Sequence, residues 1–146
     1  MSSKEDSVDL PSPSHIGVVV KDMDKTIEFL SSIWGLGPWE AFEYAPHQDE
    51  LLVGKPFRQK VAQAKLGSTA LELIEQLEGG GPWPEFLESK GEGLHHIAFT
   101  ISNYDKMVAR LEGQGAKMIA GGTFQGKCWC YFATAPGGII VEFGEK

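Results

Sequence analysis

The stretch HIGVVVKDMDKTIEFL at residues 15–30 recurs without a gap as HIAFTISNYDKMVARL at residues 96–111. Each copy begins with a short run of β-branched or aromatic residues, which is typical of a strand. Each then continues with apolar residues at helical spacing, which predicts a helix packed on one face. A strand and a helix repeated in this way predict two copies of one supersecondary unit.

Three further strand-like runs follow each copy. They lie at residues 39–44, 59–66 and 70–75 in the first half and at residues 116–121, 127–134 and 139–145 in the second, where a turn at 135–138 joins the last two. Each half therefore predicts a βαβββ module. We expect an α+β fold in which the two tandem modules form one curved, eight-stranded mixed sheet around a funnel, with the helices outside.

Changes in composition place the boundaries of these units. Residues 1–13 are polar and end in Pro-Ser-Pro, so we expect a disordered N-terminal tail. The first module is predicted over residues 14–78 and the second over residues 94–146. Residues 79–93 between them are rich in glycine and proline and predict a linker with a short helix. The two modules would share one core and so form one structural domain, 14–146.

Charge and hydropathy exclude several partners. The formal net charge is −7, and no basic cluster is present, which argues against a nucleic-acid partner. No apolar run approaches the length of about 20 residues that a membrane span needs. The polar N-terminus lacks the apolar stretch of a signal peptide, so we expect a cytoplasmic protein. Cys128 and Cys130 would share one face of a strand, which is a poor geometry for a disulfide.

The alternation of side chains along a strand selects two histidines. His15 lies opposite the apolar set of its strand, and His96 takes the same place in the second copy. His95 falls on the other, helix-facing side, where we expect it to support the strand end. The small residues Gly17 and Ala98 follow each selected histidine on the same face and would leave room for a ligand.

Each half also has one carboxylate in the middle of its apolar closing strand, Glu72 and Glu142. A buried acid is costly unless it is paired or bound to metal. Taken singly, each has an ordinary alternative, since Glu72 could face solvent and Glu142 could fray near the C-terminus. Their agreement with the repeat favours a metal centre made of His15, Glu72, His96 and Glu142. Imidazole with carboxylate suits Zn, Ni, Co, Mn or Fe(II) rather than Ca.

These residues, with GEGLHHIAFT at 91–100 and GGIIVEF at 137–143, resemble the vicinal oxygen chelate superfamily. That superfamily includes glyoxalase I, methylmalonyl-CoA epimerase, extradiol dioxygenases and bleomycin-resistance proteins. The resemblance covers residues 14–144 and is strongest to the epimerases. It implies a metal-binding funnel that holds one divalent ion on the four named side chains.

The resemblance further implies a metal-dependent isomerase or lyase, either epimerase-like or glyoxalase I-like. Such an enzyme moves a proton at a carbon next to a carbonyl through an enolate, on a small carbonyl or thioester substrate. Some epimerases carry an additional acid on the strand that matches residues 59–66. Here that strand has Lys60, Gln63 and Lys65, which leaves Glu142 or Glu72 as the base.

Two other functions stay open at this point. A bleomycin-resistance-like protein would sequester a ligand without turnover, although such proteins generally lose the metal ligands. An extradiol-type dioxygenase is favoured least, because those enzymes typically use one carboxylate. Superfamily members often form homodimers, yet both halves of this site lie in one chain. The loop at residues 44–58 could be a lid or a plain surface excursion.

Overall fold

The computed structural model describes residues 10–134 and 138–146. Most of the tail predicted at residues 1–13 and most of the turn predicted at 135–138 therefore lie outside the described residues. Within the described part, the second half has the predicted βαβββ order, and the first half has the same order with one short strand added between its second and third strands. The elements are β1 (His15–Val19), α1 (Met23–Ile33), β2 (Glu40–Tyr44), the 3₁₀ helix η2 (Gln48–Glu50), β3 (Leu51–Val53), β4 (Arg58–Leu66), β5 (Thr69–Glu78), α2 (Pro82–Lys90), β6 (Gly93–Ile101), α3 (Tyr104–Gly113), β7 (Lys117–Phe124), β8 (Lys127–Thr134) and β9 (Ile139–Glu145).

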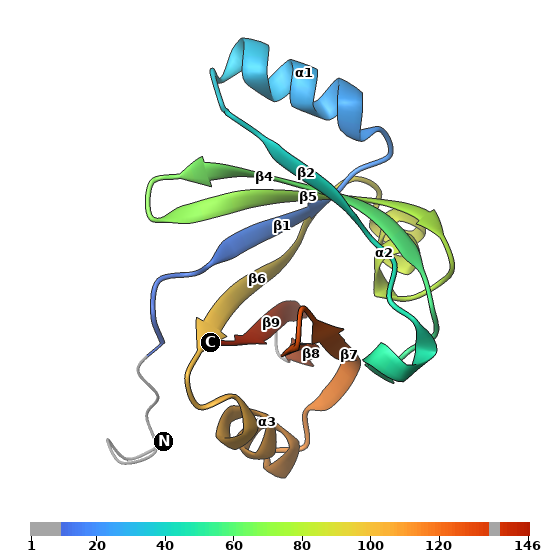
Figure 1. The fold of residues 1–146 in the computed structure, drawn as a ribbon, viewed down its shortest axis with the longest axis vertical. Coiled ribbons are helices and arrows are strands. Elements are labelled where there is room, and N and C mark those ends of the chain that lie inside the picture. Colours follow the sequence, from blue (N-terminus) through green and yellow to red (C-terminus); the bar gives the residue numbers. More distant parts are fainter. Residues whose placement is uncertain (1–9, 135–137) are drawn as a thin grey trace.

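All the strands belong to one mixed sheet with the order β2-β4-β5-β1-β6-β9-β8-β7-β3. The opening strand of each half pairs in parallel with the closing strand of the same half, β1 with β5 and β6 with β9. The two halves join where β1 runs antiparallel to β6. Figure 1 shows the sheet curling so that the two halves face each other, with α1 and α3 on the outside at opposite ends. The predicted α+β architecture is confirmed.

Local sequence explains the bounds of α1. The side chain of Asp22 caps the first turn by accepting a hydrogen bond of 3.1 Å from the backbone N–H of Lys25. At the other end Gly35 adopts a positive φ of 69°, and the N–H of Leu36 returns to the carbonyl of Leu30 at 3.2 Å. The helix buries Met23 and Leu30 against the sheet. Among the described residues, no helix is both long and apolar enough to cross a membrane.

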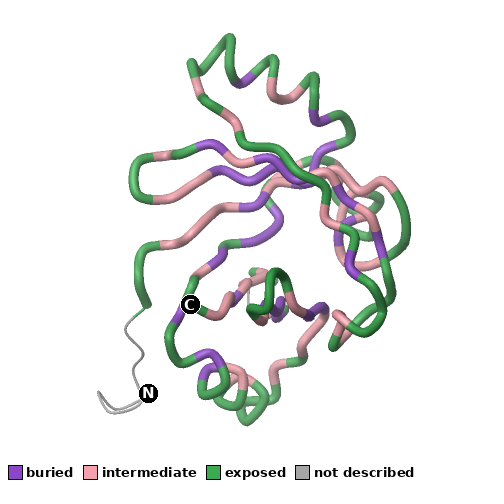
Figure 2. The backbone as a smooth tube through the Cα atoms, in the orientation of Figure 1, coloured by how far each residue is buried: buried purple, intermediate pink, exposed green. Residues whose placement is uncertain are grey.

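Three apolar clusters form the core of the part that the structure describes. One lies under α1 and a second under α3, on the outer faces of the two halves. The third lies inside the curl and brings together Val19, Ile74, Phe57, Trp83, Trp129 and Tyr131 from both halves. Figure 2 shows the buried segments running along the strands. The inner cluster forms the floor on which the site is built.

The expectation of eight strands is wrong by one, and the difference lies in the loop at residues 44–58. This segment forms η2 and then β3, which pairs antiparallel with β7 through Leu51 and Gly122. The first half thus adds a strand to the edge of the second half. A side chain at Gly122 would overlap the carbonyl oxygen of Glu50, so a glycine is needed at this crossing. A three-residue strand is too short to be distinguished by periodicity alone.

Candidate metal centre

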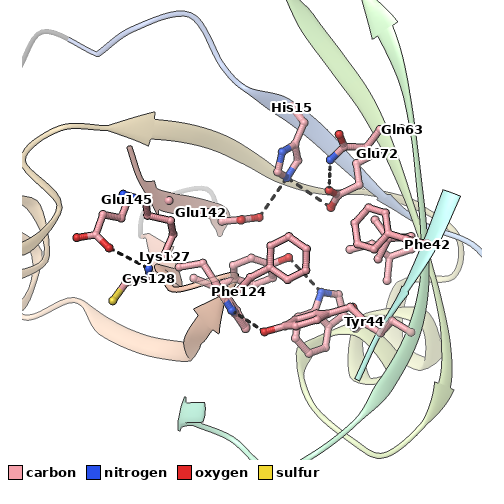
Figure 3. Close-up of a pocket in the computed structure, with 17 residues that line it drawn as sticks. His15, Phe42, Tyr44, Gln63, Glu72, Phe124, Lys127, Cys128, Glu142 and Glu145 are labelled. Atoms are coloured by element: carbon pink, nitrogen blue, oxygen red, sulfur yellow. Dashed lines mark hydrogen bonds and ion pairs between the residues drawn. The ribbon is translucent and has the colours of Figure 1, made fainter. Parts of the chain in front are cut away.

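The four side chains selected from the sequence converge on one point. His15, Glu72, His96 and Glu142 each direct one potential ligand atom there, and these atoms all lie within 4.8 Å of one another. They come from β1, β5, β6 and β9, which are the four central and adjacent strands of the sheet. Figure 3 shows His15 with the two carboxylates pointing into the space between the halves.

The contacts are short and mutual. His15 Nε2 lies 3.2 Å from Glu142 Oε1 and 3.4 Å from Glu72 Oε1. His96 Nε2 lies 3.1 Å from Glu142 Oε1 and 3.5 Å from Glu72 Oε1. The two Nε2 atoms are 3.2 Å apart. Two imidazole nitrogens and two carboxylate oxygens with their lone pairs directed inward form a donor set that could hold a divalent transition-metal ion.

Burial makes this cluster electrostatically sensitive. The His96 side chain is fully buried, and the exposed fractions of the His15, Glu72 and Glu142 side chains are 13%, 10% and 15%. Two carboxylates held this close in a dry environment need compensating positive charge. The raised pKa values of the two imidazoles are one source of that charge. A divalent cation would satisfy the same requirement, so the residues fit such a group.

The pKa values show the same coupling. Burial acts to lower the pKa of His96, but its hydrogen bonds to Glu142 and Glu72 outweigh burial and raise the pKa to about 9. The pKa of His15 is raised in the same way, since bonding to Glu142 overcomes burial. Burial favours protonation of Glu142, yet the two histidines hold the pKa of that carboxyl well below its usual range.

A second row of donors orients the two carboxylates. Gln63 stands opposite Glu72 in the β4–β5 register and donates from Nε2 to Glu72 Oε2 at 2.7 Å. Tyr131 stands opposite Glu142 in the β8–β9 register, at the corresponding place in the second half. The Tyr131 hydroxyl accepts from Trp83 Nε1 at 3.3 Å. Burial, followed by the charges of the two glutamates, raises the pKa of Tyr131 well above 10. The sequence predicts the strand that carries Gln63 but not this contact, and no pattern in the sequence points to Tyr131.

The ring of His95 does lie against a helix, as expected, but the strict alternation from which its position was predicted fails at this point. The β1–β6 register passes from Gly17–His96 directly to Val18–Leu94, so His95 is the extra residue of a β-bulge. Its ring packs edge-on against Phe86 of α2, with the centroids 5.0 Å apart. Its Nδ1 lies 2.9 Å from Nδ1 of His96. Burial and the charge of His96 lower the pKa of His95 to about 3.

The role predicted for Gly17 also needs correction. We expected its small size to leave room for a ligand. Instead, a Cβ at Gly17 would overlap the imidazole of His96, which lies directly across this position. The glycine therefore makes room for the histidine of the other half. Ala98 is buried and pairs with His15 in the β1–β6 register.

A cleft of about 250 Å³ leads from the cluster to solvent. Its walls include the large aromatic side chains of Phe42, Tyr44, Trp83, Phe124, Trp129 and Tyr131. Phe42 of β2 stacks on Phe124 of β7 at 5.8 Å, and Tyr44 accepts a hydrogen bond of 2.9 Å from Trp129 Nε1. Figure 3 shows Phe42, Tyr44 and Phe124 on the side of the cleft that faces His15 and Glu72. Cys128 lines the same cleft, and both it and Cys130 are free thiols, as predicted.

Comparison with known proteins agrees with this architecture. A family described as the Glyoxalase/Bleomycin resistance protein/Dioxygenase superfamily matches residues 14–134. The uncharacterized protein YqjC of Bacillus subtilis (strain 168) is 35% identical over 105 residues, which cover 72% of this chain and 68% of that protein. The mitochondrial methylmalonyl-CoA epimerase of Homo sapiens is 28% identical over 100 residues, 68% of this chain but only 51% of that enzyme.

Solved structures give the same fold. Methylmalonyl-CoA epimerase from Streptomyces coelicolor, in complex with 2-nitronate-propionyl-CoA, superposes with a TM-score of 0.68. The two chains are 23% identical, and the alignment covers 94% of this chain and 99% of the other. At this level of identity the likeness bears on the fold alone. The family match over most of the chain and the paired βαβββ halves show that this protein belongs to the glyoxalase/bleomycin resistance protein/dioxygenase superfamily, also called the vicinal oxygen chelate superfamily.

Proposed function

We propose that this protein is a divalent-metal-dependent isomerase or lyase that moves a proton at a carbon next to a carbonyl group. The observation that carries the proposal is the convergence of two imidazoles and two carboxylates within 4.8 Å at one end of an open cleft. The substrate would be a small carbonyl or thioester compound. Similarity to methylmalonyl-CoA epimerases supports this class without fixing the substrate.

His15, Glu72, His96 and Glu142 would hold one ion of Zn, Ni, Co, Mn or Fe(II). When bound, such an ion supplies Lewis acidity that lowers the cost of negative charge on a carbonyl oxygen. His15, Glu72 and Glu142 also line the cleft, so a substrate bound there would lie next to the residues that would hold the ion.

The carboxylates would accept the proton. Glu72 and Glu142 lie on β5 and β9, which flank the two histidine-bearing strands. A reacting carbon held over the histidines would therefore have one carboxylate from each half within reach. Gln63 on β4 contributes an amide rather than a carboxylate to the cleft, and we propose that the base is Glu72 or Glu142, the two acids of the central cluster.

The aromatic walls would bind the body of the substrate and keep water from the reacting atoms. Phe42 and Phe124 close one side of the cleft by stacking across the two halves. Trp83 and Tyr131 form part of the buried floor. An apolar enclosure of this kind strengthens electrostatic interactions at the centre. It would equally suit a protein that sequesters a ligand without turnover, which is the alternative that the experiment below must exclude.

The experiment begins with metal-depleted protein titrated with Zn, Co, Ni and Mn. The loaded protein is then incubated in deuterated water with methylmalonyl-CoA or with a methylglyoxal–thiol adduct, and exchange of the α-proton is followed by NMR. We expect metal-dependent exchange that falls at least about 100-fold in Glu142→Gln. Glu72→Gln at saturating metal serves as the matched control and should retain more exchange.

Two outcomes contradict the proposal in different ways. Tight ligand binding with no exchange would indicate sequestration. Failure of every metal to bind or to raise thermal stability would remove the metal centre itself. The cytoplasmic location and the homodimer stay predictions.

A further inference from the structure

We propose that His95 is a positioning residue for the metal centre, an inference that rests on the proposed function. It would accept a hydrogen bond from the Nδ1–H of His96 and so fix both the tautomer and the orientation of that ligand. The four proposed ligands do not include His95, although its ring lies against one of them.

The two nitrogens of His96 face different surroundings. Nε2 points at His15, Glu72 and Glu142, with distances of 3.1–3.5 Å. Nδ1 points the other way, to Nδ1 of His95 at 2.9 Å. A metal ligand needs a free lone pair, so Nε2 must lose its proton when it binds an ion. The remaining proton would then stay on Nδ1 of His96, and this N–H would donate a hydrogen bond to Nδ1 of His95.

The surroundings of His95 favour Nδ1 of its ring as the acceptor of the hydrogen bond from Nδ1–H of His96. His95 is only 5% exposed, and its ring packs against the rings of Phe86 and Tyr131, with centroid distances of 5.0 and 5.8 Å. The other nitrogen of the ring, Nε2, is buried and has no hydrogen-bond partner in the described part of the chain. Apart from a backbone interaction with Pro82, the 2.9 Å contact to His96 is the polar contact that fixes how this ring is turned in the described residues.

The reverse arrangement would work against the centre. If His95 donated from Nδ1, neutral His96 would carry its proton on Nε2, which points at the other three ligands. That tautomer has no lone pair for a metal ion. The β-bulge explains how both rings of the doublet come to lie side by side, since a regular strand would place them on opposite faces.

The proposal predicts a specific pattern among three variants. His95→Phe keeps the ring and removes the acceptor, so zinc affinity should fall about 10- to 100-fold, as for other partners of metal-bound histidines. His95→Asn places a carbonyl oxygen near the Nδ1 position and should restore most of that loss. Ile101→Ala, also buried on β6, should lower stability while leaving zinc affinity unchanged.

Zinc affinity is measured on the full chain by competition with a chromophoric chelator. Equal affinity in the wild type and His95→Phe would overturn the inference, whereas failure of the wild type to bind zinc would overturn the proposed metal centre. ¹⁵N NMR of the zinc-loaded wild type gives an answer even if His95→Phe does not fold. We expect His96 to be protonated at Nδ1 and His95 at Nε2, with a scalar coupling across the N–H···N bond. A proton assigned to Nδ1 of His95 would overturn the inference.

Discussion

Replacement of Gly17 by alanine tests the centre without touching any proposed ligand. The added methyl group would come closer than 3.0 Å to three atoms of the His96 imidazole, a separation that real Cβ atoms essentially never show. Ordinary contact begins at 3.4 Å, so the ring would have to retreat by about 1 Å or more. The backbone of β1 is fixed by its neighbours on both sides, which leaves the ring as the part that must move.

This displacement sets the size of the effect. Crowding of a packed interior typically costs about 1–3 kcal/mol, which corresponds to roughly 3–10 °C in the unfolding temperature of a chain this long. Metal ligands must stay within about 0.5 Å of their working positions, so a shift of about 1 Å removes His96 from the set. We expect zinc affinity to fall by at least about 100-fold, which is more than the loss of a second-row hydrogen bond would cause.

Gly144→Ala is the matched control. Gly144 follows Glu142 by two residues on β9, just as Gly17 follows His15 on β1, but a Cβ there would meet only Thr100 Oγ1 at 3.9 Å. Isothermal titration of both metal-depleted variants with zinc, with thermal unfolding in parallel, makes the comparison. If Gly17→Ala bound zinc as tightly as Gly144→Ala, the imidazole of His96 would not lie across Gly17, and the proposed centre would be wrong.

Three further changes probe the surroundings of the ligands. Gln63→Leu removes the 2.7 Å hydrogen bond to Glu72, so the zinc affinity measured by titration should fall about tenfold. An unchanged zinc affinity would show that Gln63 does not orient Glu72. Tyr131→Phe leaves the Trp83 indole N–H without its acceptor, so urea denaturation of the metal-free protein should show a loss of about 1–3 kcal/mol. Because the pKa of His96 is raised from 6.5 to about 9, its proton stabilises the metal-free fold fully below pH 6.5 and stops doing so as the pH rises through 9. Zinc competes with that proton, so the rise in unfolding temperature on adding zinc should grow between pH 6.5 and 9, and a constant rise would contradict the assignment.

The ligand positions could be predicted from the sequence because two simple rules act on them together. The repeat equates His15 with His96 and Glu72 with Glu142, and the period of two along a strand puts each on the inner face. A sheet joined through its two opening strands then brings all four to its centre. At these four positions neither rule depends on the details of packing, so both hold there.

The surroundings of the ligands could not be predicted, because they depend on register and on local irregularity. Whether Gln63 stands opposite Glu72 is decided by how β4 pairs with β5, and sequence alone does not specify that pairing. The bulge at His95 breaks the alternation on which its placement was based. Sequence alone cannot show that the space beside Gly17 is filled by His96, because this contact joins strands from the two halves and forms only in the folded chain.

The second row differs chemically between the two halves, with the Gln63 amide beside Glu72 and the Tyr131 phenol beside Glu142, and we take this inequality to favour Glu142 as the base. Without metal, Glu142 owes its lowered pKa to hydrogen bonds from His15 and His96, and these bonds disappear once both Nε2 atoms act as ligands. Glu72 keeps its bond from Gln63, which does not involve a ligand nitrogen. Glu142 would therefore lose the contacts that lower its pKa, and this is the reason to compare α-proton exchange in Glu142→Gln with that in Glu72→Gln.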